Sequence, residues 1–194
     1  MRLFELGGLA VSSSQLRDSA IPHLHHLANR TGLAVQLGVL DVDEVVYLER
    51  VITSDYQLPT RQGGRMPAYC TGLGKAMLAF DDAAADSVLS ADLPARTSST
   101  LSSPDRLRSD LEQVRSAGVA FDRQEAYDGL GCVAAPIRNS GRAIGAVSVT
   151  GPINRIDGKA LTALVQQTAT RIWDSRFARP SVSRRNEPAL SQAR

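Results

Sequence analysis

The first part of the chain carries apolar residues at helical spacing. Between Ser12 and Asn29 the apolar positions recur at intervals that place them on one face of a helix. Serines at 12–14 can cap this helix, and Gly32 can end it. Pro22 lies inside the pattern, so we expect a kink or a broken first turn there.

Two β-rich runs follow. Residues 33–40 and 45–52 are rich in Val and Leu and flank the acidic turn 41–44, which predicts an antiparallel hairpin. Residues 54–60 add a predicted edge strand that Pro59 stops.

The middle of the chain is predicted to be a loop followed by three helices. Residues 61–70 contain Gly-Gly and Pro, which favour a loop. Thr71 is a candidate N-cap for a short helix, and Asp81 or Asp82 for a second one. The third helical segment spans 102–118, with Ser103 as its cap, Pro104 in the first turn and a terminal glycine.

A second hairpin is almost wholly apolar. It comprises residues 131–138 and 142–151 around the turn 139–141, so it is expected at the centre of a sheet. Asp157 precedes a last amphipathic helix. Because the strands come as hairpins, the predicted fold class is α+β, with an antiparallel sheet flanked by helices.

Composition and charge exclude several classes of protein. The 194 residues are 43% hydrophobic and 22% charged, with two cysteines, which indicates a globular chain from a reducing, cytoplasmic compartment. No apolar run reaches the ~20 residues of a membrane span. The net charge is +2, of which +3 belongs to residues 178–194, which leaves −1 for the rest. The body therefore lacks the excess of basic residues that DNA binding needs, and the polar tail at 179–194 is predicted to be disordered.

Two motifs have residues typical of a metal site or a phosphate site, but neither motif matches the full pattern that such a site needs. His23, His25 and His26 share a short helical stretch, but no partner carboxylate of a zinc motif is present, which favours ordinary surface histidines. The stretch GLGKA at 72–76 departs from the P-loop pattern, which would need a glycine at Tyr69. Two interpretations of this stretch remain: its small residues allow close helix packing, or the free amides at the helix start contact an anion.

Candidate nucleophiles and carboxylates also have plain structural interpretations. Cys70 and Cys132 lie outside any CxxC motif, which favours buried small side chains over a thiol nucleophile. Asp122, Glu125 and Asp128 cluster within seven residues, where they could perform acid–base chemistry or cap turns; turn capping is favoured.

Two hydroxyl residues share one face of the last strand. Ser148 and Thr150 alternate with Val147 and Val149, so their side chains point to the same side of the sheet. Buried hydroxyls need hydrogen-bond partners, which can be a ligand, the backbone or water.

Together these segments resemble a known family. GRMPAYCTGLGKAMLA at 64–79 and VRSAGVAFDRQEAYDGLGCVAAPIRNSGRAIGAVSVTGPINR at 114–155 resemble the effector-binding domain of the IclR family of bacterial transcription regulators. The resemblance implies a GAF/PAS-like sensor fold at 32–178, preceded by a linker helix within 1–31. It implies no enzyme activity, metal or cofactor.

The resemblance also implies a ligand and partners. The ligand is a small organic acid or aromatic metabolite, and the chain forms a homodimer or homotetramer. DNA binds only through a winged helix–turn–helix domain that is absent here, and residues 2–10 resemble the last strand of its wing. Tyr69 stands where many relatives have histidine. The implied pocket residues are Leu58, Met66, Gly72, Leu73, Asp122, Leu130, Cys132, Ser148 and Thr150.

Two alternatives differ in class. One is a GAF-like thiol enzyme of the sulfoxide reductase type, which would need a cysteine of lowered pKa. The other is an oligomerisation module whose pocket is filled, with Met66 or Tyr69 in the ligand position.

Overall fold

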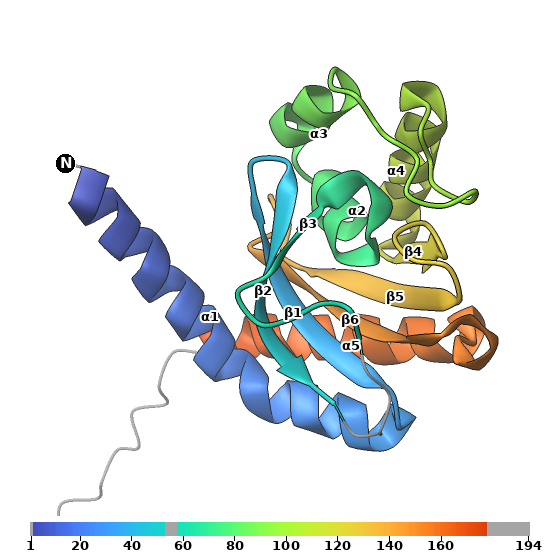
Figure 1. Cartoon of the computed structure of the whole chain (residues 1–194). Helices are drawn as coiled ribbons and strands as arrows, with labels where there is room; N and C mark the ends of the chain where they lie inside the picture. Colours follow the sequence, from blue (N-terminus) through green and yellow to red (C-terminus); the bar gives the residue numbers. More distant parts are fainter. Residues whose placement is uncertain (1, 53–57, 178–194) are drawn as a thin grey trace, which may run out of the picture.

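The chain folds around a six-stranded antiparallel sheet with helices on both faces (Figure 1). The computed structural model describes residues 2–52 and 58–177. The strands lie in the order β3-β2-β1-β6-β5-β4. The helices and strands, in chain order, are α1 (Arg2–Thr31), β1 (Ala34–Asp41), β2 (Glu44–Val51), β3 (Arg65–Pro67), α2 (Gly72–Leu78), α3 (Asp82–Leu89), α4 (Pro104–Ala117), β4 (Ala120–Arg123), β5 (Leu130–Ile137), β6 (Gly145–Pro152) and α5 (Gly158–Phe177).

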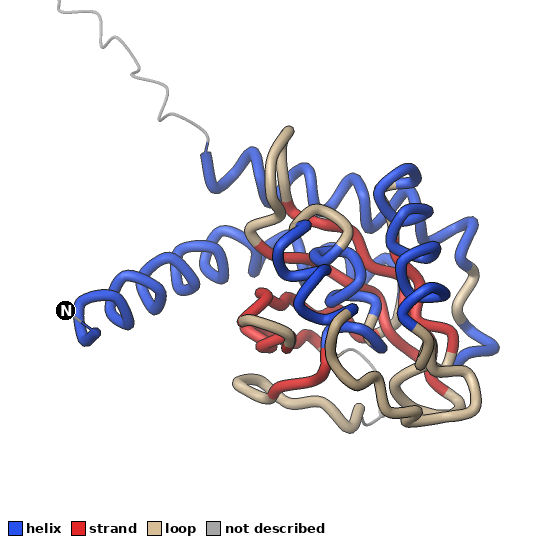
Figure 2. Tube along the Cα trace, turned by 90° about the horizontal axis from the view of Figure 1, so that it is seen from above, coloured by secondary structure: helices blue, strands red, loops and turns tan. Residues whose placement is uncertain are grey.

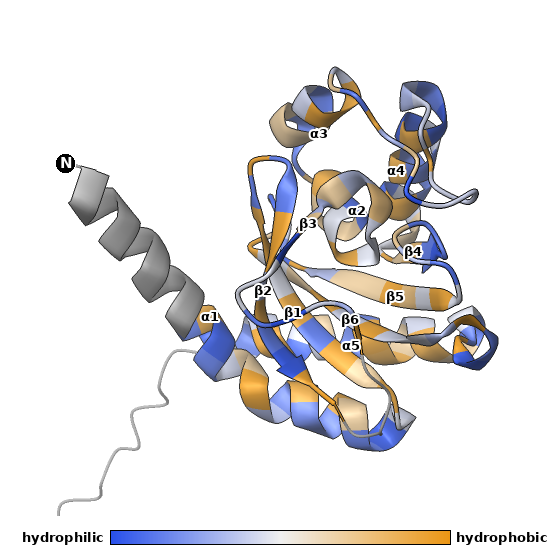
Figure 3. Cartoon of the chain, in the orientation of Figure 1, coloured by the Kyte–Doolittle hydropathy of each residue, from blue (hydrophilic) through white to orange (hydrophobic). Residues whose placement is uncertain are grey.

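Alternation along the strands divides the core into two layers. On β5 and β6, Val133, Val147 and Val149 face α1 and α5, which pack against each other on one side of the sheet. Cys132 and Ala134 point to the opposite side, where α2 lies on the sheet and α3 and α4 pack around α2. Strand β5 is accordingly apolar along most of its length, whereas α4 carries a polar outer face (Figure 3). The α+β antiparallel fold class is confirmed.

The predicted hairpins and most predicted caps are confirmed. Strands β1 and β2 pair from Asp41↔Glu44 onward, and β5 pairs with β6. Asp81 caps α3, because its side chain accepts a hydrogen bond from the Ala84 amide. Ser103 precedes α4 as expected but makes no capping hydrogen bond with its side chain.

The first helix is longer than its apolar pattern predicts. Helix α1 begins at Arg2 rather than near Ser12, so the expected wing strand at 2–10 is wrong. Extending an existing helix adds one hydrogen bond per residue, which outweighs weak local signals. Pro22 lies inside α1 and does not interrupt it. Figure 1 shows that the ribbon of α1 changes direction along the length of the helix.

The third strand lies where a loop is expected. Most of the predicted edge strand at 54–60 falls outside the described residues, and the described residues 58–60 are not a strand. Strand β3 comes instead from 65–67 and pairs with β2, with Met66 opposite Val45. Pro67 is tolerated because β3 is an edge strand, so its missing N–H costs no ladder bond.

The sheet centre also differs in detail. The two middle strands are β6 and β1, whereas β5 lies between β6 and the edge strand β4. The predicted tail at 179–194 lies outside the described residues. None of the helices in the described part is long and apolar enough to cross a membrane.

Candidate functional site

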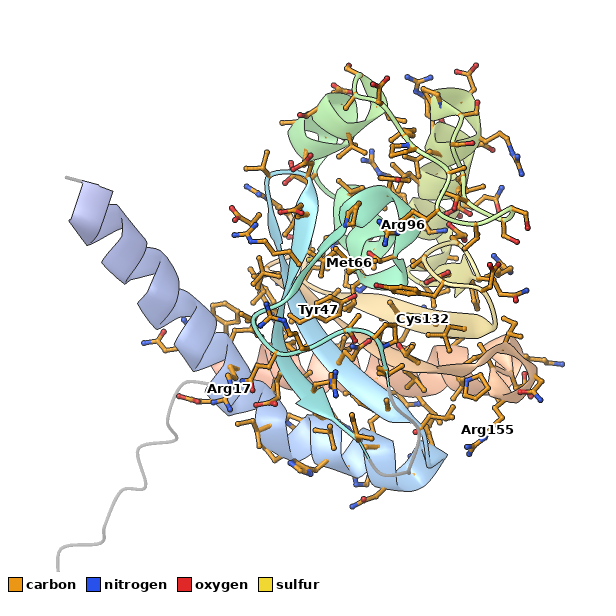
Figure 4. The ribbon with its side chains drawn as sticks, viewed as in Figure 1. Arg17, Tyr47, Met66, Arg96, Cys132 and Arg155 are labelled. Atoms are coloured by element: carbon orange, nitrogen blue, oxygen red, sulfur yellow. The ribbon has the colours of Figure 1, made fainter. Side chains whose placement is uncertain are left out.

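A cavity lies between the sheet and α2 and collects all nine residues that the sequence predicts for a pocket. Figure 4 shows three of its residues, Tyr47, Met66 and Cys132, in the space between the sheet and α2. The free space in which a water molecule can move is about 30 Å³. The lining consists of Gln36, Tyr47, Leu58, Pro59, Thr60, Met66, Thr71, Gly72, Leu73, Asp122, Ala126, Tyr127, Leu130, Cys132, Ser148 and Thr150.

Strands β1 and β6 form a polar floor. Thr150 Oγ1 donates to Gln36 Oε1 at 3.2 Å, and Gln36 Nε2 donates to Thr60 Oγ1 at 2.6 Å. Ser148, directly opposite Gln36 in the ladder, is 0% exposed, and its Oγ has no hydrogen-bond partner within the described part of the chain. An unpaired buried hydroxyl costs about 1–3 kcal/mol, so this oxygen is a ready contact for a ligand.

The start of α2 forms the roof. Thr71 caps the helix as predicted, because its Oγ1 accepts from the Gly74 amide at 3.1 Å. The amides of Gly72 and Leu73 then have no acceptor within their own helix. A Cβ on Gly72 would lie 2.7 Å from Cys132 Sγ, so a glycine is needed to keep the roof close to the sheet.

Asp122 is the carboxyl group of the lining. It is 7% exposed, and its Oδ1 accepts from the amides of Glu125 at 2.7 Å and Ala126 at 3.4 Å. The predicted turn-capping role is therefore confirmed. Burial raises the pKa of Asp122 to about 7, despite these amide bonds. Among the described residues, no Lys, Arg or His lines the cavity.

A buried ion cluster lies behind the roof and was not predicted from the sequence. Lys75 is 0% exposed, and its Nζ donates to Glu125 Oε1 at 2.8 Å and Oε2 at 2.7 Å. Asp110 Oδ2 on α4 lies 3.0 Å from the same Nζ. Burial raises the pKa of Glu125, while Lys75 acts in the opposite direction. The available signal was a single lysine in a helix otherwise made of small and apolar residues.

The thiols and histidines do not form a reactive centre. Cys70 and Cys132 are free and buried, and burial raises the pKa of both to about 12, which disfavours a thiolate. His23 Nε2 lies 2.8 Å from Ser175 Oγ, across to α5. No set of three metal-binding side chains gathers anywhere in the ranges 2–52 and 58–177.

Tyr69 does not line the cavity. Its hydroxyl donates to the Pro94 carbonyl at 2.6 Å, on the far side of the 3₁₀ turn before α2. Tyr47 and Tyr127 line the cavity instead, and neither was predicted from the sequence. Alternation along β2 could have placed Tyr47 on the cavity face, but Tyr127 lies in a loop without periodicity.

Comparison with known proteins agrees with this architecture. Residues 8–173 match the family model described as the bacterial transcriptional regulator IclR, C-terminal. The Pca regulon regulatory protein of Pseudomonas putida is 35% identical over 164 residues, which are 80% of this chain and 55% of that protein. The regulator XynR of Escherichia coli is 34% identical over 171 residues, 86% of this chain and 68% of that protein. The chain thus spans roughly half to two thirds of these two curated relatives.

A solved structure shows the same fold with a ligand. An IclR homologue from Microbacterium hydrocarbonoxydans, complexed with 4-hydroxybenzoate, superposes with a TM-score of 0.82 at 28% identity, covering 92% of this chain and 75% of that one. The matched proteins are named as transcriptional regulators, which are not enzymes. This chain belongs to the IclR family of bacterial transcriptional regulators, and it corresponds to the family's C-terminal domain.

Proposed function

We propose that residues 32–178 are the effector-binding domain of a cytoplasmic transcriptional regulator, and that 1–31 is its linker helix. The ligand is a small organic acid or aromatic metabolite that occupies the cavity under α2. The observation that carries this proposal is the Ser148 hydroxyl, fully buried and unpaired among the described residues, beside the helix-start amides of Gly72 and Leu73. Such convergent polar groups in an apolar concavity are typical of small-molecule sites.

Binding must change the shape of the pocket. A free space of about 30 Å³ holds only one or two water molecules. An organic acid therefore requires the apolar wall to move, and Met66, with its unbranched side chain, is the residue best suited to do so. A ligand that binds the expanded form shifts the conformational equilibrium of the domain toward it. We propose that this shift controls DNA binding by another domain of the regulator.

Self-association completes the proposal. The C-terminal part of α1 packs on α5 and β1, whereas the N-terminal part projects beyond the body in two perpendicular views (Figures 1 and 2). A projecting helix is only marginally stable in water, and a second copy of the chain is its proposed partner, in a homodimer or homotetramer.

The test is a thermal melt of the chain with a panel of small organic acids that includes 4-hydroxybenzoate. A ligand at about 100 times its Kd adds about 2.7 kcal/mol, which raises the Tm by roughly 5–10 °C at this chain length. The double variant Ser148→Ala, Thr150→Val should reduce that shift. The control pair Ser87→Ala, Thr170→Val, on exposed positions, should leave it intact.

The ligand-free alternative makes the opposite prediction. An oligomerisation module without a working pocket would keep its self-association while no acid in the panel moves its melting temperature. That result would refute effector binding.

A further inference from the structure

Asp122 is a buried carboxyl group on the cavity side of the sheet. It lies directly opposite Cys132 in the ladder of β4 and β5, so the two side chains point to the same face. Both line the cavity, and Asp122 is 7% exposed. Its Oδ1 accepts from the amides of Glu125 and Ala126, and no hydrogen bond within the described part of the chain goes to Oδ2. Oδ2 is therefore the oxygen that a ligand can contact.

The buried ammonium group of Lys75 does not neutralise Asp122. Its Nζ lies 2.7 and 2.8 Å from the two carboxylate oxygens of Glu125, and 3.0 Å from Asp110 Oδ2. One positive charge thus faces two carboxylates, so the cluster is negative overall when all three groups are ionised. A negative cluster behind the roof raises the cost of a further negative charge on Asp122.

A ligand carboxylate in this cavity comes close to Asp122. Under the proposed function it contacts the free amides of Gly72 and Leu73. Gly72 packs against the backbone of Asp122, because a Cβ built on this glycine would lie 3.6 Å from the Asp122 amide nitrogen. Among the described residues, no Lys, Arg or His lines the cavity and could offset the repulsion. Two carboxyl groups so close together in a buried site without a counter-charge cannot both be ionised, and they share one proton.

We infer that the domain binds its acidic effector together with one proton, which Asp122 Oδ2 holds and donates in a hydrogen bond to the ligand carboxylate. The proton comes from the solvent, so the bound pair carries only the single negative charge of the ligand. Such a charge-assisted hydrogen bond is short and strong. This inference rests on the proposed function, because it concerns the same ligand, and it makes effector binding dependent on pH.

The titration of Asp122 supports this inference. Burial raises the pKa of Asp122 to about 7, although its amide hydrogen bonds and Lys75 act in the opposite direction. Asp122 therefore changes from the protonated to the ionised form close to neutral pH. A bound carboxylate shifts this equilibrium further toward the protonated form, and by linkage the protonated form binds the carboxylate more tightly.

Other titratable groups surround Asp122 on every side. They are Tyr47 on β2, Cys70 before α2, Lys75 on α2, Asp110 on α4, Glu125 and Tyr127 in the loop after β4, and Cys132 on β5. Burial raises the pKa of both thiols to about 12 and also raises the pKa of Tyr47, so these three groups stay neutral below about pH 9. Burial also raises the pKa of Glu125, so the experiment must distinguish Glu125 from Asp122.

Calorimetric titration of the chain between pH 5.5 and pH 8.5 tests the inference. The probes are acetate, lactate, benzoate and 4-hydroxybenzoate, each with its uncharged primary amide, and the acid that binds most tightly is used for the pH series. Two buffers of different ionisation enthalpy are compared, because the difference in heat measures the number of protons taken up. The chain should take up about one proton per ligand at pH 8.5 and almost none at pH 5.5. The affinity for the acid should fall about 30-fold from pH 6 to pH 8.5, and that for the amide by less than about threefold.

The variant Asp122→Asn distinguishes a proton donor from a merely structural residue, because its side-chain amide can donate a hydrogen bond at every pH. Its affinity for the acid should stay within about threefold from pH 6 to pH 8.5, and at pH 8.5 it should bind about tenfold more tightly than the unaltered chain. The control Asp128→Asn removes an exposed carboxyl group of the same loop and should keep the full pH dependence. The proton count of the unaltered chain does not depend on either variant.

The outcomes separate this inference from the proposed function. If an acid binds and no proton is taken up at pH 8.5, proton-coupled binding is refuted while effector binding stands. If the uptake persists in Asp122→Asn, the proton belongs to another group, such as Glu125, and the role of Asp122 is refuted. If no acid binds the unaltered chain anywhere between pH 5.5 and pH 8.5, both proposals fail.

Discussion

Replacing Lys75 with methionine should destabilise the domain strongly and in a pH-dependent way. Methionine has a similar length, so the change removes the charge with little change in packing. The Nζ of Lys75 is 2.7 Å from Glu125 Oε2, and at an effective dielectric constant of about 20 that separation corresponds to about 6 kcal/mol of attraction. Part of it offsets the cost of burying both groups. Breaking a buried pair from one side leaves the other charge uncompensated, and the expected loss is about 3–5 kcal/mol at pH 7.5.

The pH dependence has a definite sign. Burial raises the folded-state pKa of Glu125, and without Lys75 it rises further. A carboxyl group with a raised folded-state pKa destabilises the fold progressively as the pH rises above its unfolded value. The loss caused by Lys75→Met should therefore be smaller at pH 5 than at pH 7.5. Adding Glu125→Gln should recover at least about 1–2 kcal/mol, because no buried carboxylate then remains at that position.

The assay is urea unfolding at one fixed protein concentration, followed by circular dichroism and by the fluorescence of the single tryptophan, Trp173. The matched control is Lys159→Met, which alters the other lysine of the chain, on the exposed start of α5; it should cost less than about 0.5 kcal/mol. A loss below about 1 kcal/mol for Lys75→Met, or a double variant no more stable than the single one, would refute the reasoning.

Three further predictions concern the cavity and its surroundings. The variant Asp122→Asn should be more stable than the unaltered chain by up to about 4 kcal/mol at pH 7.5, and nearly equal to it at pH 4. The reason is that the raised pKa of Asp122, about 7, penalises the charged form only as the pH rises above about 4. A difference in unfolding free energy that stays constant across that pH range in urea melts would contradict this. Gly74→Ala should prevent folding, since the new Cβ would lie 2.1 Å from the backbone oxygen of Ala68; a normal circular dichroism spectrum and melt would show the close approach to be unimportant. Alkylation of Cys70 and Cys132 by iodoacetamide should be slow at pH 7.5, and its rate should rise sharply in urea. Mass spectrometry measures the extent of labelling. Rapid labelling of the folded chain would support the thiol-enzyme interpretation.

Local patterns in the sequence were sufficient to predict several of the residues and helix caps that form the site. Period-two alternation placed Ser148 and Thr150 on one face of β6, and the structure shows both in the floor of the cavity. Thr71 was recognisable as a helix cap from its position alone, and Asp122 as a turn-capping residue. These features depend on residues within a few positions of one another, so a short window of sequence contains the information.

Tertiary structure alone decided which distant residues meet. The pairing of Lys75 with Glu125 joins residues 50 positions apart, and nothing local to either residue reveals the partner. Strand β3 forms at 65–67 despite the neighbouring glycines, because β2 offers a free edge there. Gly63 and Gly64 exchange backbone hydrogen bonds with Tyr47 only because the segment before β3 runs along the edge of β2. Such contacts depend on how whole elements pack, and the short-range periodicity that predicts each element does not encode the packing between them.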